Sequence, residues 1–441
     1  MRIGSNRIET RNVQVERLEN RTLLAGDVGI DVINGMLHIT DDDLDNHIAI
    51  EAGEEDNAYV ITGLPDANGE DTTVGGETST TVEGITRGIH IKMGKGNDAA
   101  MLGDLDVRGI LGISMGPGDD TVDLNNVDVG RHAILHLGGG EDTANVTDAN
   151  VAGHLAIVGQ ARRKPPTPEK GDDTENRPGD RPGNRPEQPP ENRPGDRSGN
   201  RPEQPPENRP GDRPEVSPET PPASHISISG TEVGGMLAVV TGGGADEIDI
   251  SNSSAHRAMR VQTSTGTDTV SITDAKAGRH LNVSTGAGED DISLTNVSSR
   301  GASHVFGGLH NDDIHIVGST FRGLSINTGG GAEDNVTVGN STFHKGLSIR
   351  GGHGVDNLNL SNVDVQGMTR IATGGGADMI NVVDSVFAKR FQLHSGADTD
   401  QLSISGSTFE GPALLASGQG EDTFVDDNNQ FVDGLRENFD L

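Results

Sequence analysis

Apolar and polar residues alternate along most of this chain in a pattern that returns every 22 residues. Each repeat contains one aspartate at the end of a Gly-rich stretch, which we number as position 0 and call the anchor. The repeat is apolar at +2 and +4, as in Ile248 and Ile250, and at +13 and +15, as in Leu281 and Val283. This alternation predicts two β-strands per repeat, each with one side facing a core. The anchors are Asp98, Asp120, Asp142, Asp246, Asp268, Asp290, Asp312, Asp334, Asp356, Asp378, Asp400 and Asp422.

Two further positions predict the path of the chain between these strands. Position +9 is mostly a single apolar residue, such as Val129 or Phe321, and predicts a third inward-facing point. Position +6 is Asn, Asp or Gly in every repeat, as in Asn126, Asp274 and Gly318. These three residue types tolerate a positive φ, so we expect a left-handed corner after the first strand of every repeat.

The repeats predict an all-β fold, a parallel β-helix or β-solenoid, in which each 22-residue repeat forms one coil. Counting back from Asp246 places a degenerate anchor at Ser224, so the chain holds about 13 coils. Stacked coils bury a narrow column of Val, Ile and Leu, which agrees with a composition of one Tyr, nine Phe and no Trp. The coil length favours a right-handed β-helix over the hexapeptide-repeat type, whose coils have about 18 residues.

Residues 161–222 interrupt the solenoid pattern, which occupies 85–160 and resumes over 223–441. The interruption contains copies of a 16-residue unit rich in Pro, Arg and Glu, and it enters at a Gly-rich corner. This composition predicts a disordered, partly polyproline-II insertion, either a tether or binding arm or an expanded surface loop. The two solenoid parts form one continuous stack or two stacks on a linker, and the preserved register favours one stack.

The N-terminal region lacks the 22-residue period. Residues 27–84 contain strand-like pieces and predict an irregular β cap, which a solenoid needs at its end. Residues 1–26 carry five arginines, and the run Val15–Ala25 (VERLENRTLLA) resembles the LExRxLLA segment near the start of many exported planctomycete proteins. The resemblance implies an export or sorting segment and a secreted or cell-surface protein; a short helix or disordered tail is the alternative.

The formal net charge of −34, from 68 acids and 34 bases, narrows the classes of partner. Such a surface repels nucleic acid, whose binding depends on Lys and Arg contacts to phosphate, and it repels anionic lipid. The absence of Cys excludes disulfides and thiol catalysis. Because no run of 18 apolar residues occurs, we expect no membrane span.

The Gly-rich corner suggests a metal. Residues 351–359 (GGHGVDNLN) fit the pattern G-G-x-G-x-D-x-U-x and resemble the calcium-binding repeat of RTX proteins, although RTX coils have two such turns and this coil has one. The resemblance implies Ca²⁺ as a cofactor, with all twelve anchors as metal ligands. Calcium takes six to eight oxygens, and acids such as Glu289 and Glu333 stand beside anchors. Alternatively, each anchor accepts hydrogen bonds from its own turn and needs no metal.

The sequence favours a non-enzymatic extracellular or cell-surface protein, a spacer or adhesin, with cell-surface glycans or matrix proteins as candidate partners. Its oligomeric state is open. The alternative is a glycan-acting β-helix enzyme, a lyase or a glycoside hydrolase. Asp119 and Asp120 are similar to a catalytic pair of acids, but an acid beside the anchor is a feature of the repeat and marks no unique site. We therefore assign no catalytic residue.

Overall fold

The computed structural model describes residues 26–159 and 221–438. The segment at 1–25 and nearly all of the Pro-rich insertion lie outside these residues. The described chain forms strands and turns without a helix, so the predicted all-β class is confirmed. It accordingly contains no helix of the length and apolarity that a membrane span needs.

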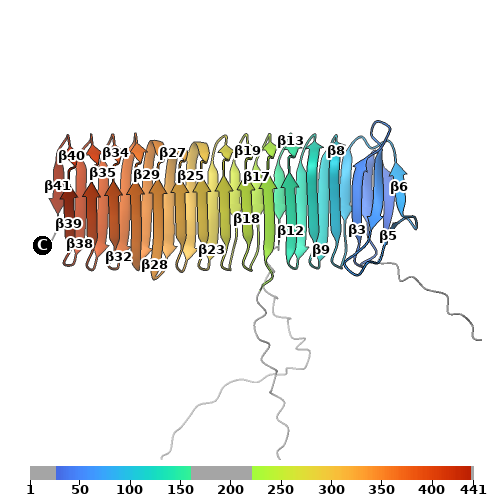
Figure 1. Ribbon diagram of the computed structural model, residues 1–441, viewed down its shortest axis with the longest axis horizontal. Helices are drawn as coiled ribbons and strands as arrows, with labels where there is room; N and C mark the ends of the chain where they lie inside the picture. The colour runs from blue at the N-terminus through green and yellow to red at the C-terminus, as the bar shows by residue number, and fades with distance from the viewer. Residues whose placement is uncertain (1–25, 160–220, 439–441) are drawn as a thin grey trace, which may run out of the picture. The chain divides into compact units, whose positions relative to one another are not determined.

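One coil illustrates the architecture. After Asp268, the chain forms β21 (Thr269–Thr273), the two-residue β22 (Lys276–Ala277) and β23 (Leu281–Ala287). Each of these strands pairs in parallel with its equivalent in the next coil, 22 residues later, as Ile272 does with Leu294. The coils follow one another along the stack in the order of the sequence (Figure 1). The predicted parallel β-solenoid of about 13 coils is therefore confirmed.

The other strands that stack from coil to coil fall into three columns. The first column contains β3 (His47–Ala52), β8 (Ala99–Val107), β10 (Thr121–Val129), β12 (Asp142–Thr147), β15 (Ser224–Ser229), β18 (Glu247–Ser251), β24 (Asp291–Thr295), β26 (Asp313–Val317), β28 (Glu333–Gly339), β30 (Val355–Ser361), β33 (Met379–Val383), β36 (Gln401–Ser405) and β39 (Thr423–Asp427). The short middle column contains β13 (Asn150–Val151), β16 (Glu232–Val233), β19 (Ser254–Ala255), β31 (Asp364–Val365), β34 (Val386–Phe387), β37 (Thr408–Phe409) and β40 (Gln430–Phe431). The third column contains β2 (Met36–Thr40), β7 (Gly88–Lys92), β9 (Ile110–Pro117), β11 (Ala133–Gly139), β14 (Leu155–Val158), β17 (Leu237–Val240), β20 (Met259–Gln262), β25 (Ser298–Leu309), β27 (Thr320–Gly330), β29 (Thr342–His353), β32 (Met368–Gly375), β35 (Phe391–Ala397), β38 (Ala413–Gln419) and β41 (Leu435–Asn438).

The inward positions form one apolar column, as the alternation predicts. Ile248, Ile250 and Leu281 are fully buried. At position +9, Phe387, Phe409 and Phe431 stack on one another, with ring centroids 5.1 Å and 4.7 Å apart. Equal positions in successive coils are thus direct neighbours, so similar residues pack in ladders.

The predicted left-handed corner is present in every coil. All thirteen residues at +6 have φ between 48° and 64°, including the three glycines at 230, 318 and 406. In two places the corner side chains also bond along the stack: Asn126 donates to Asp104 at 2.7 Å, and Asn296 donates to Asp274 at 3.1 Å.

The coils pair directly across the Pro-rich insertion. Strand β12 pairs with β15, with Asp142 opposite Ser224, and β14 pairs with β17. Ser224 therefore occupies an anchor position, as counting back from Asp246 predicts, and the described coils form one continuous stack.

The N-terminal cap contains more of the repeat than the sequence reveals. Strand β1 (Gly26–Ile33) pairs with β2, and β4 (Tyr59–Leu64) pairs with β3 and β6 (Ser79–Val82), all antiparallel. Strand β5 (Thr72–Val74) pairs in parallel with β1. However, β2 and β3 also pair in parallel with β7 and β8 of the first regular coil. The buried Asn46 stands in the anchor position, because its N–H donates to the carboxyl of Asp98 at 2.8 Å.

Candidate functional site: the ladder of anchor aspartates

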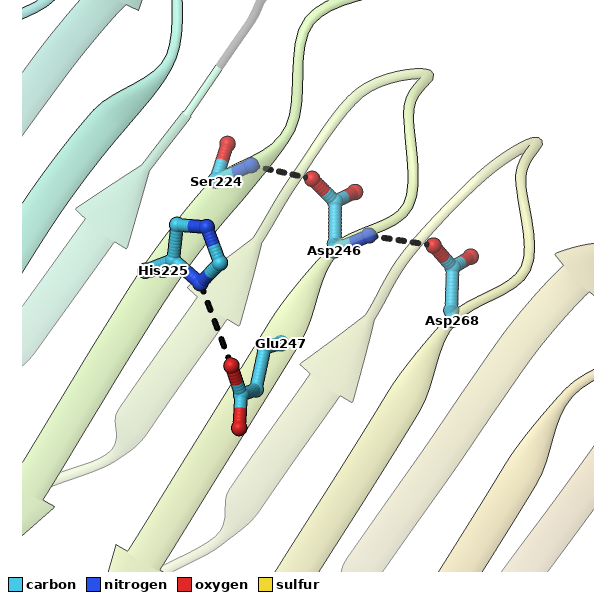
Figure 2. A network of polar contacts seen from close by, with 5 residues as sticks. All are labelled: Ser224, His225, Asp246, Glu247 and Asp268. Atoms are coloured by element: carbon cyan, nitrogen blue, oxygen red, sulfur yellow. Dashed lines mark hydrogen bonds and ion pairs between the residues drawn. The ribbon is translucent and has the colours of Figure 1, made fainter.

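The twelve anchors lie inside the coils. Each is at most 4% exposed. For eleven of them, Oδ1 accepts a hydrogen bond from the backbone N–H in the anchor position of the preceding coil, at 2.7–3.2 Å. Figure 2 shows two steps of this ladder: Ser224 donates to Asp246, and Asp246 donates to Asp268. The anchors therefore join neighbouring coils.

The donor in this ladder differs from the one expected for a self-contained turn. The alternative to calcium predicts that each aspartate accepts from N–H groups of its own turn, whereas the observed donor belongs to the neighbouring coil. Each carboxyl can accept from that coil because parallel strands lie side by side at ~4.8 Å.

The second carboxyl oxygen is the unusual part of the site. Among the described residues, the Oδ2 atom of all twelve anchors is buried without a hydrogen-bond partner. A buried ionised carboxylate is costly unless it is paired, so burial favours the protonated form. Burial accordingly raises the pKa of Asp98, Asp120 and Asp142 to about 7, and that of Asp312 to about 8.

The residue five positions before the anchor lies beside this carboxyl. A Cβ atom built on Gly351 would come within 1.9 Å of Oδ2 of Asp356, and one on Gly307 within 2.3 Å of Oδ2 of Asp312. This −5 position is apolar in the first three regular coils and carries a hydroxyl in most later ones. Its residues in chain order are Met93, Met115, Leu137, Gly159, Thr241, Thr263, Thr285, Gly307, Thr328 (one place earlier in its coil), Gly351, Thr373, Ser395 and Ser417.

Hydroxyls at −5 oppose the effect of burial. Burial raises the pKa of Asp268 and Asp378 to about 6 only, because Thr263 and Thr373 lower it in part. In the structure the hydroxyl of Thr263 donates its single proton to the carbonyl of Thr285 at 2.7 Å, so it must rotate away from that carbonyl to donate to the ionised carboxyl of Asp268. The coil interior thus contains a proton-binding group whose affinity depends on one neighbouring side chain.

The glycines of the turn allow the coils to approach. Gly138 has φ +107°, and a Cβ atom there would lie 1.7 Å from the carbonyl oxygen of Gly116 in the preceding coil. The next residue, Gly139, has open space around it. His310 and Asp398, which replace a turn glycine, also take positive φ values of 77° and 79°. The repeated geometry of this turn therefore explains the Gly-rich pattern without reference to a metal.

The predicted calcium ligands face the coil interior in this arrangement. No group of three or more His, Asp or Glu side chains in 26–159 and 221–438 is placed to hold a metal ion. At the outer side of the anchor turns, a hollow of about 350 Å³ is lined by the anchors Asp268 and Asp290 and by exposed acids that include Glu289, Asp291, Asp313 and Glu333. Calcium at the anchors would have to compete with the backbone N–H donors, and it stays a prediction.

A second polar ladder, not predicted from the sequence, joins the coils at position +7. The buried position +7 is Ser in several coils, and each hydroxyl accepts from the backbone N–H at +7 of the preceding coil. Ser319 accepts from Val297 at 3.0 Å, and Ser341 accepts from Ser319 at 3.1 Å. The signal was the recurrence of Ser at a single position between two apolar ones.

Comparison of the chain with protein-family models, with curated proteins and with solved structures found no match.

Proposed function

We propose that this chain is a non-enzymatic structural or adhesive repeat protein of the cell surface or extracellular space. The observation that supports this proposal is the equivalence of the coils. The same anchor, corner and core positions recur along the whole described stack, and each coil pairs with its immediate neighbours. A property repeated in every coil suits a spacer or an extended binding surface better than a single reaction centre.

Location is tested on intact cells of the source organism. An antibody against the solenoid should label intact cells, or detect the protein in the medium, at the level seen after permeabilisation. Labelling that requires permeabilisation, with no protein in the medium, would overturn the proposal. A reporter fused to residues 1–26 tests the export segment separately, with Arg17 and Leu23 replaced by Ala in the matched control.

Calcium stabilisation belongs to this proposal as a separate part. If calcium binds at the corners, it stabilises the folded chain by mass action, so chelation lowers Tm. The test compares Tm of the full chain with calcium, with EDTA and with magnesium. An unchanged Tm after chelation would remove calcium from the proposal and leave the scaffold role standing.

The alternative, a glycan-acting enzyme, is tested by incubating the chain with neutral and anionic polysaccharides. Appearance of new reducing ends, or of the unsaturated product that a lyase forms, would replace the scaffold role with catalysis.

A further inference from the structure

The basic residues of the solenoid are confined to one side of the coil. Between Asp98 and Asp400, the described chain contains 13 Lys and Arg residues, and 12 of them lie at positions +10 to +16. The exception is Lys276, at +8. Over the same coils no Asp or Glu occurs at +10 to +16; the first is Glu410. We call these positions, from Arg108 to His394, the basic face.

The charges of the basic face are available to a partner. All twelve Lys and Arg side chains are exposed. The ion pairs of the described chain involve Lys95, His225 and His256, so none of the twelve is paired with a carboxylate. Arg370 donates only to the neutral side chain of Gln392, at 3.3 Å. A protein with a net charge of −34 that leaves these cations unpaired on one side has a surface fit for an anion.

A hollow lies within this face. It has a volume of about 400 Å³ and spans four successive coils, from Ala302 to Arg370. Here β25, β27 and β29 continue without a break from the middle column into the third column, and their pairing register shifts before Ala302 and before Gly323. The hollow is open at Gly323 and Gly346 because glycine has no side chain to fill it, and Lys345 and Arg370 also line it. The hollow therefore runs along the stacking direction with cations beside it.

The regular spacing favours a linear polyanion as the occupant. Equivalent positions recur about every 4.8 Å along the stack, so an extended polymer with regularly spaced anionic groups can meet cations in several coils. A nucleic-acid duplex winds its phosphates away from a straight row. Proteins that bind a single strand stack its bases on several aromatic side chains, whereas the basic face exposes only one Phe, Phe306, and no Tyr or Trp. A protein partner would need aromatic or other large anchor residues at its centre. At physiological salt the Debye length is about 8 Å, so acids on the other sides of the coil are screened.

We infer that the basic face binds an anionic polysaccharide, carboxylated or sulfated, along the stacking axis and centred on the hollow at Lys345 and Arg370. This inference rests on the proposed adhesive role, because it names the partner.

Binding of the full chain to polygalacturonate and to dextran sulfate, with neutral dextran as a control, tests the inference. Both polyanions should bind in preference to neutral dextran, and the stronger one identifies carboxylate or sulfate as the preferred group. The logarithm of the affinity should fall linearly with the logarithm of the salt concentration. The double variant Lys345→Gln/Arg370→Gln should weaken binding about tenfold and reduce the salt slope by about 2.

The matched control is Lys95→Gln/Lys276→Gln, which removes two exposed cations outside the basic face. An equal loss of binding in both double variants, each with the wild-type melting curve, overturns the inference. So does the absence of binding to either polyanion, tighter binding to a DNA duplex, or self-association of the chain that the first variant abolishes. If the protein is found at the cell surface but binds neither polyanion, the inference fails and a spacer role remains. If it binds a polyanion but is found only inside the cell, the proposed location is wrong.

Discussion

The first three regular coils and the coils from Asp246 onward share one backbone and differ in the surroundings of the anchor carboxyl. In both regions the anchor is buried and accepts the N–H of the preceding coil. The first region places Met115 or Leu137 at −5, and the pKa of its anchors is raised by burial to about 7. The second region places a hydroxyl there in most coils, and beside Thr263 the pKa of Asp268 rises only to about 6.

This difference shows that the backbone ladder and the proton affinity of the anchors are separate properties. The ladder follows from the 22-residue stacking, which is the same in both regions. Proton affinity follows from desolvation and from the polar groups in reach, which a single side chain changes. Asp312, beside Gly307, is the extreme case, with a pKa raised by burial to about 8.

The largest effect on stability should come from a change of pH, because the anchors with a raised pKa all titrate over the same pH range. A carboxyl whose folded pKa exceeds its unfolded value of 3.8 stabilises the fold fully below pH 3.8 and loses that contribution as the pH rises through the folded pKa. Each such carboxyl contributes about 1.4 kcal/mol per pKa unit. We therefore expect Tm to fall by about 10 °C or more between pH 4 and pH 8, measured by calorimetry at constant ionic strength.

Hydrogen exchange divides this pH effect between the two regions. As the pH rises, the amides near Asp268 and Asp378 should lose protection at a pH about one unit lower than the amides near Asp98 and Asp120, after correction for intrinsic exchange. A Tm that is constant or rises from pH 4 to pH 8 would show that the anchors are ionised in the folded chain.

Substitution of a turn glycine should have the next largest effect and should be equal in the two regions. Gly138→Ala and Gly374→Ala each force a Cβ atom to within 2.0 Å of a backbone carbonyl oxygen at a positive φ. We expect a loss of about 3 kcal/mol or more for each in urea unfolding. The neighbours Gly139→Ala and Gly375→Ala, which meet nothing closer than 3.6 Å, are the controls and should change stability little. Equal costs at the two neighbouring positions would contradict the close approach of the coils.

Substitution of one anchor distinguishes the contribution of the ladder hydrogen bond from the contribution of carboxyl protonation. Asp120→Ala leaves the buried N–H of Asp98 without its acceptor and should cost about 1–3 kcal/mol. Asp120→Asn retains an oxygen acceptor and cannot ionise, so at pH 8 it should be at least as stable as the wild type. Equal destabilisation by Ala and Asn at pH 8, in urea unfolding, would mean that the carboxylate charge is required.

The smallest effect is expected when the −5 residues of the two regions are exchanged. Met115→Thr should lower the pKa of Asp120 from about 7 toward the value of about 6 at Asp268, and Thr263→Val should raise the pKa of Asp268. Titration of ¹³C-labelled aspartate carboxyls by NMR measures both shifts. Thr263→Ser keeps the hydroxyl and serves as the control. If the two exchanges leave the pKa values unchanged, the difference between the regions has another origin.

Much of the fold could be predicted because a solenoid repeats its local rules. Alternation at +2, +4, +13 and +15 specifies inward strands, and Asn, Asp or Gly at +6 specifies a left-handed corner. Counting in steps of 22 even located Ser224 across the insertion. Asn46 was missed because an antiparallel excursion through β4 and β6 separates it from Asp98 by 52 residues, which hides the period.

The sequence by itself determined the coil, its corner and the residues that stack, because each depends on spacing within 22 residues. Only the tertiary structure decided which way the anchor carboxyls point, since the same spacing suits a metal ligand facing solvent and a buried acceptor of N–H groups. It also gathered the cations onto one face. Arg131, Arg257 and Lys345 are far apart in the chain, and they become one surface only when each coil closes and stacks on the last.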